Sequence, residues 1–277
     1  MRSVSPNKTP ESDGPGTRSP FAPTRRGLIA ALAVMSTVAG ASAAHAGAIF
    51  PWWAHRRRGD HHHHPCFLSG TRIRTPKGEV AVESLEIGDL VQTVSGEAKP
   101  IKWIGRRRFE RTGDGTWPTN VMPIRDARSA FGPLAPHSDL FLSEAHAVYL
   151  DGLLIPIKNL INGRSIVRCS SFDAETIDYF HIELAGHDVI FAEGAPTETL
   201  LGRGESEFDN EVGREGVSQS MPLGPLEPFA PIVPMFNNRA TVRSRLRSAV
   251  SPWVDRRQPT DMVWDRLAER AETQIAA

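Results

Sequence analysis

Apolar and polar residues alternate through much of the chain between residues 66 and 194. Such alternation is typical of strands that bury one face, because successive side chains of a strand point to opposite sides. Clear examples are residues 71–75, 79–85 and 99–105, and turn-forming pieces with glycine separate the strand-like segments. Short strands that recur at intervals of roughly ten residues predict an all-β domain.

Two segments of this region resemble each other. Residues 78–88 and 152–163 each contain a turn glycine, an apolar strand, a leucine and a second glycine, and they align with one insertion. The likeness predicts a pseudo-two-fold arrangement of the β domain. The alternative is that they are unrelated strand–turn–strand pieces, which resemble one another in general.

Helical spacing occurs only near the end of the chain, after a polar and then proline-rich stretch. Residues 240–250 and 261–277 carry apolar positions at helical spacing, and Asp261 is placed to cap the second helix. One face of the second helix is formed by Val263, Leu267 and Arg270. We expect this face to pack on the β domain or on a partner.

The first 46 residues have the composition of a disordered segment followed by an export signal. Residues 1–24 are mostly serine, proline, glycine and charged residues, which cannot bury enough surface to fold. Residues 25–46 run from paired arginines through an apolar stretch to small residues, the order of a twin-arginine signal with its cleavage site. The apolar stretch is short of the ~20 residues of a membrane anchor. We therefore expect an exported protein, periplasmic or extracellular, with no stable membrane span in the mature chain.

Residues 47–65 form a linker that mixes tryptophan, arginine and four consecutive histidines, His61–His64, without periodicity. Imidazole is a good ligand for zinc, nickel or copper. The histidine run is therefore either a metal-binding tether or a solvated low-complexity segment. The sequence shows no second cluster of ligands nearby, which favours the solvated segment.

Charge and cysteine content exclude several functions. The chain has 32 basic and 32 acidic residues, so no net field recruits nucleic acid. Cys66 and Cys169 are the only cysteines, which allows one internal disulfide at most and no thiol-rich zinc site. The sequence contains no serine-hydrolase elbow, phosphate loop or zinc-protease motif, and we expect no cofactor.

Three ordered blocks carry a resemblance to a known family. They are residues 66–75 with the following Leu85–Asp89, then Leu142–His146, then Tyr179–Gly194. Together they resemble the Hint superfamily, the fold shared by inteins and hedgehog autoprocessing domains, and in particular its bacterial Hint-type subfamily. The resemblance assigns residues 66–201 to a Hint-type β domain and leaves 202–277 as a polar, proline-rich linker with C-terminal helices.

The resemblance implies a self-processing reaction rather than turnover of a separate substrate. The thiol of Cys66 would attack the carbonyl carbon of Pro65 and convert the peptide bond into a thioester. The histidine of the second block falls on His146, which would serve the amide nitrogen. The threonine of that block is replaced by Ser143, which keeps the hydroxyl that holds the scissile peptide. The substrate would thus be the chain's own N-terminal peptide.

Two further histidines match family positions. His181 lies about where many inteins have an aspartate that assists the shift, and His187 falls on the histidine of the closing block. Each could instead be an ordinary strand residue. Cys66 also has two other interpretations, as a small buried apolar residue or as half of a disulfide with Cys169.

The sequence departs from inteins at the end of the closing block. Inteins end in His-Asn before a second nucleophile, whereas this chain continues with residues 195–201 and has no such pair. We therefore expect no splicing, and the thioester would be hydrolysed or intercepted by an unknown external nucleophile. Cleavage would release only the short peptide 47–65, and the ring of Pro65 crowds the carbonyl group that the thiol would attack. These two features leave an alternative open. In it, the domain is a catalytically silent β module for envelope or surface binding, with the histidine run as a metal tether.

Overall fold

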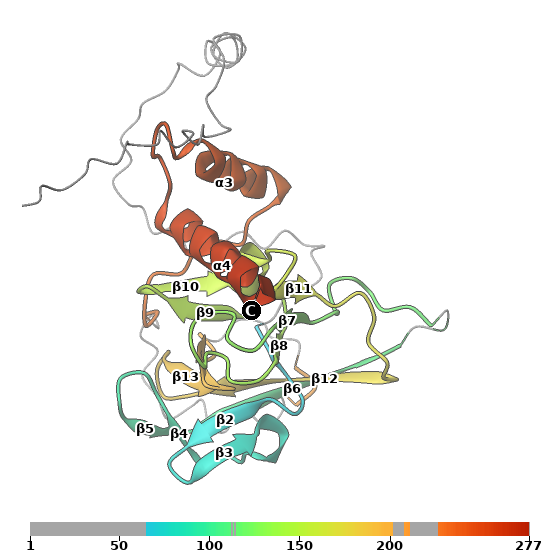
Figure 1. The fold of residues 1–277 in the computed structure, drawn as a ribbon. Helices are drawn as coiled ribbons and strands as arrows, with labels where there is room; N and C mark the ends of the chain where they lie inside the picture. The colour runs from blue at the N-terminus through green and yellow to red at the C-terminus, as the bar shows by residue number, and fades with distance from the viewer. Residues whose placement is uncertain (1–64, 112, 114, 202–207, 211–226, 277) are drawn as a thin grey trace, which may run out of the picture. The chain divides into compact units, whose positions relative to one another are not determined.

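Two β-sheets and a pair of C-terminal helices make up the described part of the chain (Figure 1). The computed structural model describes residues 65–111, 113, 115–201, 208–210 and 227–276. The expected disordered segment, export signal and histidine run all fall before residue 65 and lie outside the described residues. They remain predictions.

The first sheet contains the strand that begins directly after Cys66. Its six antiparallel strands are, in spatial order, β11 (Ile166–Arg168), β7 (Ile124–Asp126), β8 (Leu140–Leu142), β1 (Phe67–Leu68), β12 (Thr176–Glu183) and β6 (Trp103–Glu110). The short strand β1 pairs with β8 on one side and with β12 on the other. The start of the domain therefore lies inside the sheet, where its backbone has fixed partners on both sides.

The second sheet also has six strands, and a separate hairpin accompanies it. In spatial order its strands are β10 (Leu153–Pro156), β9 (Ala147–Leu150), β14 (Ala195–Glu198), β13 (Val189–Ala192), β2 (Arg72–Thr75) and β3 (Gly78–Ala81). The separate hairpin consists of β4 (Leu90–Gln92) and β5 (Ala98–Pro100). The predicted all-β domain with short C-terminal helices is confirmed.

The two similar sequence segments adopt matching structures. Strand β3 leads into the 3₁₀ helix η3 (Val82–Ser84), and strand β10 leads into η4 (Ile157–Leu160). Each strand starts at or directly after a glycine with positive φ, Gly78 at 119° and Gly152 at 80°, a conformation that strongly favours glycine. Strands β3 and β10 form the opposite edges of the same sheet. The expected pseudo-two-fold arrangement is thus visible in the topology.

The main hydrophobic core is formed by the inward-facing residues of both sheets. Strand β8 shows the principle, because Leu140 and Leu142 are fully buried whereas Phe141 between them is only partly buried. Strand β7 follows the same alternation with one unusual residue. Its inward positions are Ile124 and Asp126, and both are fully buried. The core therefore contains a carboxyl group.

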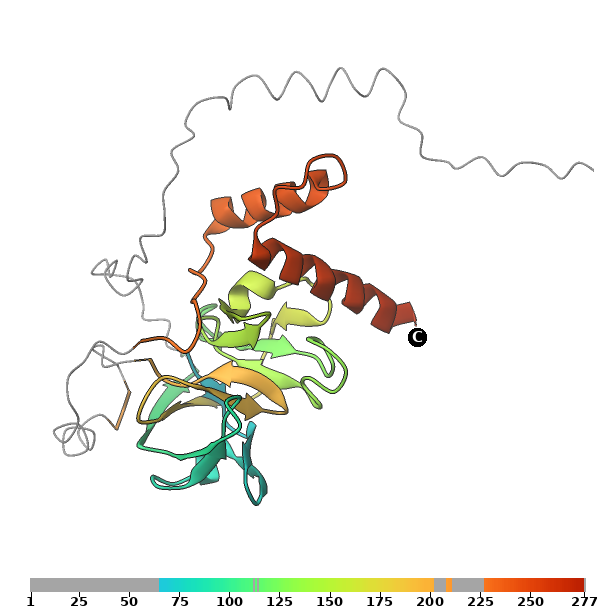
Figure 2. The same cartoon turned by 90° about the vertical axis from the view of Figure 1, so that its left-hand side faces the viewer.

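Both predicted helices are present, as α3 (Asn238–Val250) and α4 (Pro259–Ala276). Val263 and Leu267 of α4 belong to the main core of the β domain. Figure 2 shows α4 on the side of the β domain that carries β10 and η4, and α3 beyond it. The expected packing of this helix face on the β domain is confirmed.

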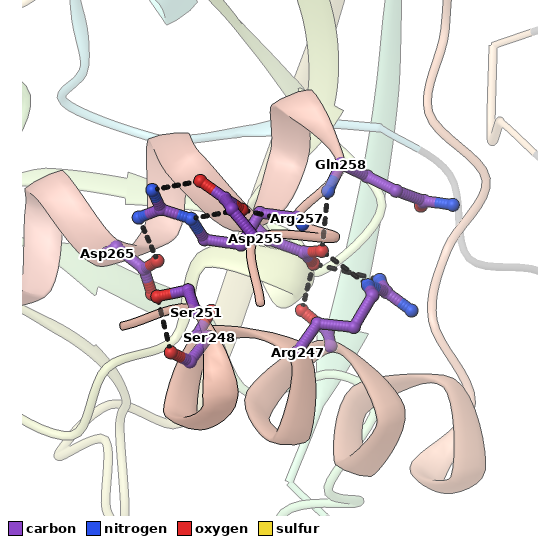
Figure 3. A network of polar contacts seen from close by, with 9 residues as sticks. Arg247, Ser248, Ser251, Asp255, Arg257, Gln258 and Asp265 are labelled. Carbon is purple, nitrogen blue, oxygen red and sulfur yellow. Dashed lines mark hydrogen bonds and ion pairs between the residues drawn. The ribbon is translucent and has the colours of Figure 1, made fainter. Parts of the chain in front are cut away.

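A polar network joins α3 to α4 (Figure 3). The carboxylate of Asp261 accepts hydrogen bonds from Ser244 Oγ at 2.5 Å, from Arg247 Nε at 2.6 Å and from the Gln258 N–H at 2.8 Å. Asp261 is not the capping residue that the sequence predicts, because α4 already starts at Pro259. Proline suits the first helical position, since its missing N–H would have no partner there. Asp261 instead reaches back from the first turn to the N–H that precedes the helix.

No helix within the described residues is both long enough and apolar enough to cross a membrane.

Candidate active site

Strand pairing brings Cys66 and Ser143 together, although 77 positions separate them in the sequence. Cys66 directly precedes β1 and Ser143 directly follows β8, and these strands pair with Phe67 opposite Leu142. The Cys66 N–H donates a hydrogen bond of 2.8 Å to Ser143 Oγ, and the Ser143 N–H donates one of 3.0 Å to the Cys66 carbonyl oxygen. The nitrogen of the Pro65–Cys66 peptide bond is therefore held by the Ser143 hydroxyl.

His146 lies one tight turn after Ser143 and points into the protein. Its N–H donates to the Ser143 carbonyl oxygen at 3.1 Å, and its side chain is fully buried. The centre of its ring lies 4.3 Å from that of Phe67 and 5.2 Å from that of His181. The residue after Cys66 and two of the candidate histidines thus form one buried cluster of rings.

The environment of His146 favours its neutral form. Burial lowers the pKa of His146 to about 4, whereas the carboxylate of Glu198 and the backbones of Cys66 and Glu198 act to raise it. Backbone groups of Cys66 and Glu198 lie beside the ring, but within the described part of the chain neither ring nitrogen has a hydrogen bond of good geometry. At neutral pH the ring therefore offers one nitrogen that can accept a proton and one N–H that can donate.

The thiol of Cys66 is buried in a second apolar cluster, with Leu68, Tyr179 and Trp103 among its members. Burial raises the pKa of the Cys66 thiol, and the positive charge of Arg107 opposes this only in part. The sulfur is therefore a neutral thiol in the folded protein, and it needs a base before it can attack.

The structure has no disulfide between Cys66 and Cys169. Both Cys66 and Cys169 are free thiols, although they belong to the same apolar cluster. The other interpretation, a small apolar residue that fills space, agrees with the burial of the thiol in this cluster and is not tested by the backbone contacts with Ser143.

His181 and His187 occupy different surroundings. His181 lies on β12 opposite Gly105 of β6, is fully buried and contacts the ring of His146. His187 accepts a hydrogen bond from the Phe229 N–H at Nδ1, and its Nε2 lies 3.7 Å from Glu198 Oε2. Among the described residues, no ring contact joins His187 to the cluster of His146.

Glu198 is a residue of this site that the sequence does not single out. Its carboxylate accepts a hydrogen bond of 2.7 Å from the Ala147 N–H, directly after His146, and it faces His187 on the other side. It therefore connects His187 to the segment that carries His146. No motif marks Glu198, because only the pairing of β14 with β9 brings it next to Ala147.

The family of the chain follows from a comparison of its sequence with models of known families. The model of the Hint domain matches residues 65–204, which is half of the chain and the whole of the region that carries the site. The chain belongs to the Hint domain family. Its described β domain is thus of the intein-like, autoprocessing type, as the ordered blocks of the sequence predict. No curated protein matches the chain.

Solved structures with a similar fold include inteins and an intein-like domain. The gp41-1 intein is 13% identical, with 48% of this chain and 98% of that chain covered and a TM-score of 0.35. The bacterial intein-like domain from Clostridium thermocellum is 14% identical, with 49% and 98% covered and a TM-score of 0.35. The DnaB intein from Synechocystis sp. PCC 6803 is 11% identical, with 50% and 99% covered and a TM-score of 0.33.

Proposed function

We propose that this Hint domain cleaves its own chain between Pro65 and Cys66 through an N-to-S acyl shift, without splicing. The observation that supports the proposal best is the 2.8 Å hydrogen bond from the Cys66 N–H to Ser143 Oγ. This bond connects the Pro65–Cys66 peptide to Ser143, the residue to which the resemblance to the family assigns the task of holding that peptide.

The reaction exchanges one bond for another within the chain. The sulfur of Cys66 bonds to the carbonyl carbon of Pro65, and the bond between that carbon and the Cys66 nitrogen breaks. The thiol proton passes to a base, and the departing nitrogen takes up a proton to leave as an amine. The product is a thioester, with the former amide nitrogen as a free amino group.

His146 and Ser143 have separate roles in this proposal. The neutral imidazole of His146 accepts the thiol proton or delivers a proton to the departing nitrogen, and its place beside the Cys66 backbone supports either step. Ser143 Oγ holds the nitrogen in place, so that the amide is oriented as the sulfur attacks. His181 orients the His146 ring through their contact. His187 acts on His146 only indirectly, through Glu198, which binds the Ala147 N–H.

The fate of the thioester follows from the end of the domain. The chain has no His-Asn pair after β14, so an external nucleophile or water would release the acyl group. Export through the predicted twin-arginine signal would place this reaction in the periplasm or outside the cell. The peptide released from the mature chain would then be the histidine-rich linker, residues 47–65.

Hydroxylamine tests the proposal directly, because it attacks thioesters far faster than amides. Full-length protein treated with hydroxylamine at neutral pH should break into two fragments, one of which begins with Cys66, as read by intact mass spectrometry. Cys66→Ala should remain whole, and Cys169→Ala, the matched control for the second free thiol, should break like wild type. Full-length, uncut masses for both wild type and Cys66→Ala after treatment would contradict the proposal.

A silent β module is the second candidate, and one observation favours it. The Cys66 thiol is buried with a raised pKa, so the reactive thiolate is scarce. In that case the domain would serve in binding at the envelope or surface, with His61–His64 as a metal tether. Nickel or zinc binding that disappears with His61–His64→Gln, in a chain that hydroxylamine never cuts, would favour this function.

A further inference from the structure

A second cluster of ionisable side chains lies on elements that do not carry the candidate active site. It consists of Glu79 on β3, His137 in the segment between β7 and β8, and Glu193 in the turn between β13 and β14. One ligand atom from each of the three residues lies within 4.8 Å of the others. The three residues come from separate parts of the sequence, so only the fold brings them together.

Backbone contacts fix the positions of two of these residues. The His137 N–H donates to the Glu193 carbonyl oxygen at 2.8 Å, and the Glu193 N–H donates to the Arg72 carbonyl oxygen at 2.8 Å. Gly194 then allows the imidazole to approach, because a Cβ at this position would lie 2.9 Å from His137 Cδ2. The segment that carries His137 is thus held closely against the turn that carries Glu193.

The carboxylate of Glu193 is oriented by further hydrogen bonds. Its Oε1 accepts the Arg72 N–H at 2.7 Å, and its Oε2 accepts the Ser138 hydroxyl. The residue is only 5% exposed. An oriented, buried carboxylate with lone pairs left over is the usual condition of a metal ligand whose outer partners fix its direction.

The cluster has an excess of negative charge, which a bound cation would balance. Two carboxylates share the site with a single imidazole, whose Nε2 lies 2.8 Å from Glu79 Oε1 and whose Nδ1 lies 3.7 Å from Glu193 Oε2. The guanidinium of Arg72 lies 3.8 Å from Glu79 Oε2, but its side chain is 59% exposed, so solvent weakens its effect. A divalent cation between the three side chains would balance the remaining charge.

We propose that Glu79, His137 and Glu193 form a binding site for a divalent transition-metal ion such as Zn²⁺. One imidazole nitrogen and two carboxylate oxygens are ligands that zinc accepts, and three protein ligands leave a position for water. Ligand atoms of a tetrahedral zinc lie about 3.3–3.5 Å apart, so side-chain rotations that bring the three ligand atoms closer together would complete the site. The ion would replace the hydrogen bond between His137 and Glu79.

Zinc binding to purified protein tests this site without reference to peptide cleavage. The background is the full-length chain with Cys66→Ala and His61–His64→Gln, which keeps the chain whole and removes the competing thiol and histidine run. Isothermal titration with Zn²⁺ at pH 7.5 should show one tight site in this background. Adding His137→Gln or Glu79→Gln should weaken that site more than about tenfold.

Glu86→Gln is the matched control, because it removes an exposed carboxylate that is not a member of the cluster and should leave the affinity unchanged. Zinc should also raise the melting temperature of the background but not that of His137→Gln. Equal zinc affinity in the background and in both Gln variants, or no tight site in the background, would overturn the proposal. If His137→Gln does not fold, the zinc affinity of Glu79→Gln, a substitution on the edge strand β3, decides between the outcomes.

Discussion

At the scale of single residues, the Ser143 hydroxyl links the fold to the proposed chemistry. Ser143→Ala leaves the buried Cys66 N–H without its acceptor, which should cost about 1–3 kcal/mol in the free energy of unfolding. It should also slow cleavage by hydroxylamine, because the nitrogen is no longer held. Urea unfolding and the rate of fragment formation measure the two effects.

Two control variants make the result specific. Ser143→Thr keeps a hydroxyl at the same position and should retain most of the cleavage rate. Ser171→Ala removes an exposed serine and should change neither quantity. A cleavage rate that is the same in Ser143→Ala and in wild type would show that the hydroxyl does not take part.

His146 should make the stability of the protein depend on pH. Its pKa is about 4 when folded and about 6.5 when unfolded, so the unfolded chain binds the extra proton first as the pH falls. The stability that the neutral ring confers is fully present above pH 6.5, declines as the pH falls, and is lost at about pH 4. The 2.5-unit difference corresponds to roughly 3 kcal/mol.

Comparison with His146→Gln isolates this effect from the carboxyl groups that titrate in the same range. The free energy of unfolding should fall more steeply between pH 6.5 and pH 4 for wild type than for the variant. Parallel curves for the two proteins would show that His146 titrates alike in the folded and unfolded states.

At the scale of elements, strand β7 departs from the rule that inward positions are apolar. Asp126 lies opposite Ile166 of β11 and Leu140 of β8, and neither of its carboxylate oxygens has a hydrogen-bond partner among the described residues. Burial raises the pKa of Asp126 well above its usual 3.8. As the pH rises, the folded protein therefore keeps the proton on this carboxyl group at pH values where the unfolded chain has already lost it.

This difference should lower the stability of the protein as the pH rises above about 4, because the unfolded chain then binds fewer protons. Asp126→Asn has nearly the same shape and cannot ionise. We expect the variant to gain stability relative to wild type as the pH rises from 4 to the raised pKa of Asp126, as measured by urea unfolding. A difference that stays constant over this range would mean that Asp126 ionises without cost.

The sequence predicts elements better than it predicts contacts between them. The repeated segments predict the strands β3 and β10, because each repeat is local and begins at a turn glycine, but they do not predict the 3₁₀ helices η3 and η4 that follow. The family blocks likewise point to Ser143 and His146. Glu198 carries no such signal, since its neighbours depend on which strands pair. The same holds for His137 and Glu79, which are 58 positions apart.

At the scale of the whole molecule, the C-terminal helices are part of the fold even though the family match ends at residue 204. Leu267 of α4 is fully buried in the main core, and the Trp264 indole N–H donates to the Ile161 carbonyl oxygen beside η4. Arg266 of the same helix pairs with Asp151 at 2.6 Å. The extension thus covers apolar surface of the β domain that would otherwise face water.

Leu267→Ala should therefore destabilise the entire protein and not the helix alone. The loss of a fully buried leucine side chain typically costs 2–5 kcal/mol, through lost burial and the cavity that remains. Leu246→Ala on α3 is the matched control, because that leucine is 58% exposed and its loss should change stability by less than about 0.5 kcal/mol. The chain has six tryptophans, so the comparison uses one variant that keeps only Trp103, in the β domain, and one that keeps only Trp264, in α4. Urea unfolding followed by fluorescence should give the same transition in both, and Leu267→Ala should shift the two together. Separate transitions for the two tryptophans, with that of Trp103 unchanged by Leu267→Ala, would mean that the helices unfold independently of the β domain. The burial of Leu267 among residues of both sheets argues against such independence.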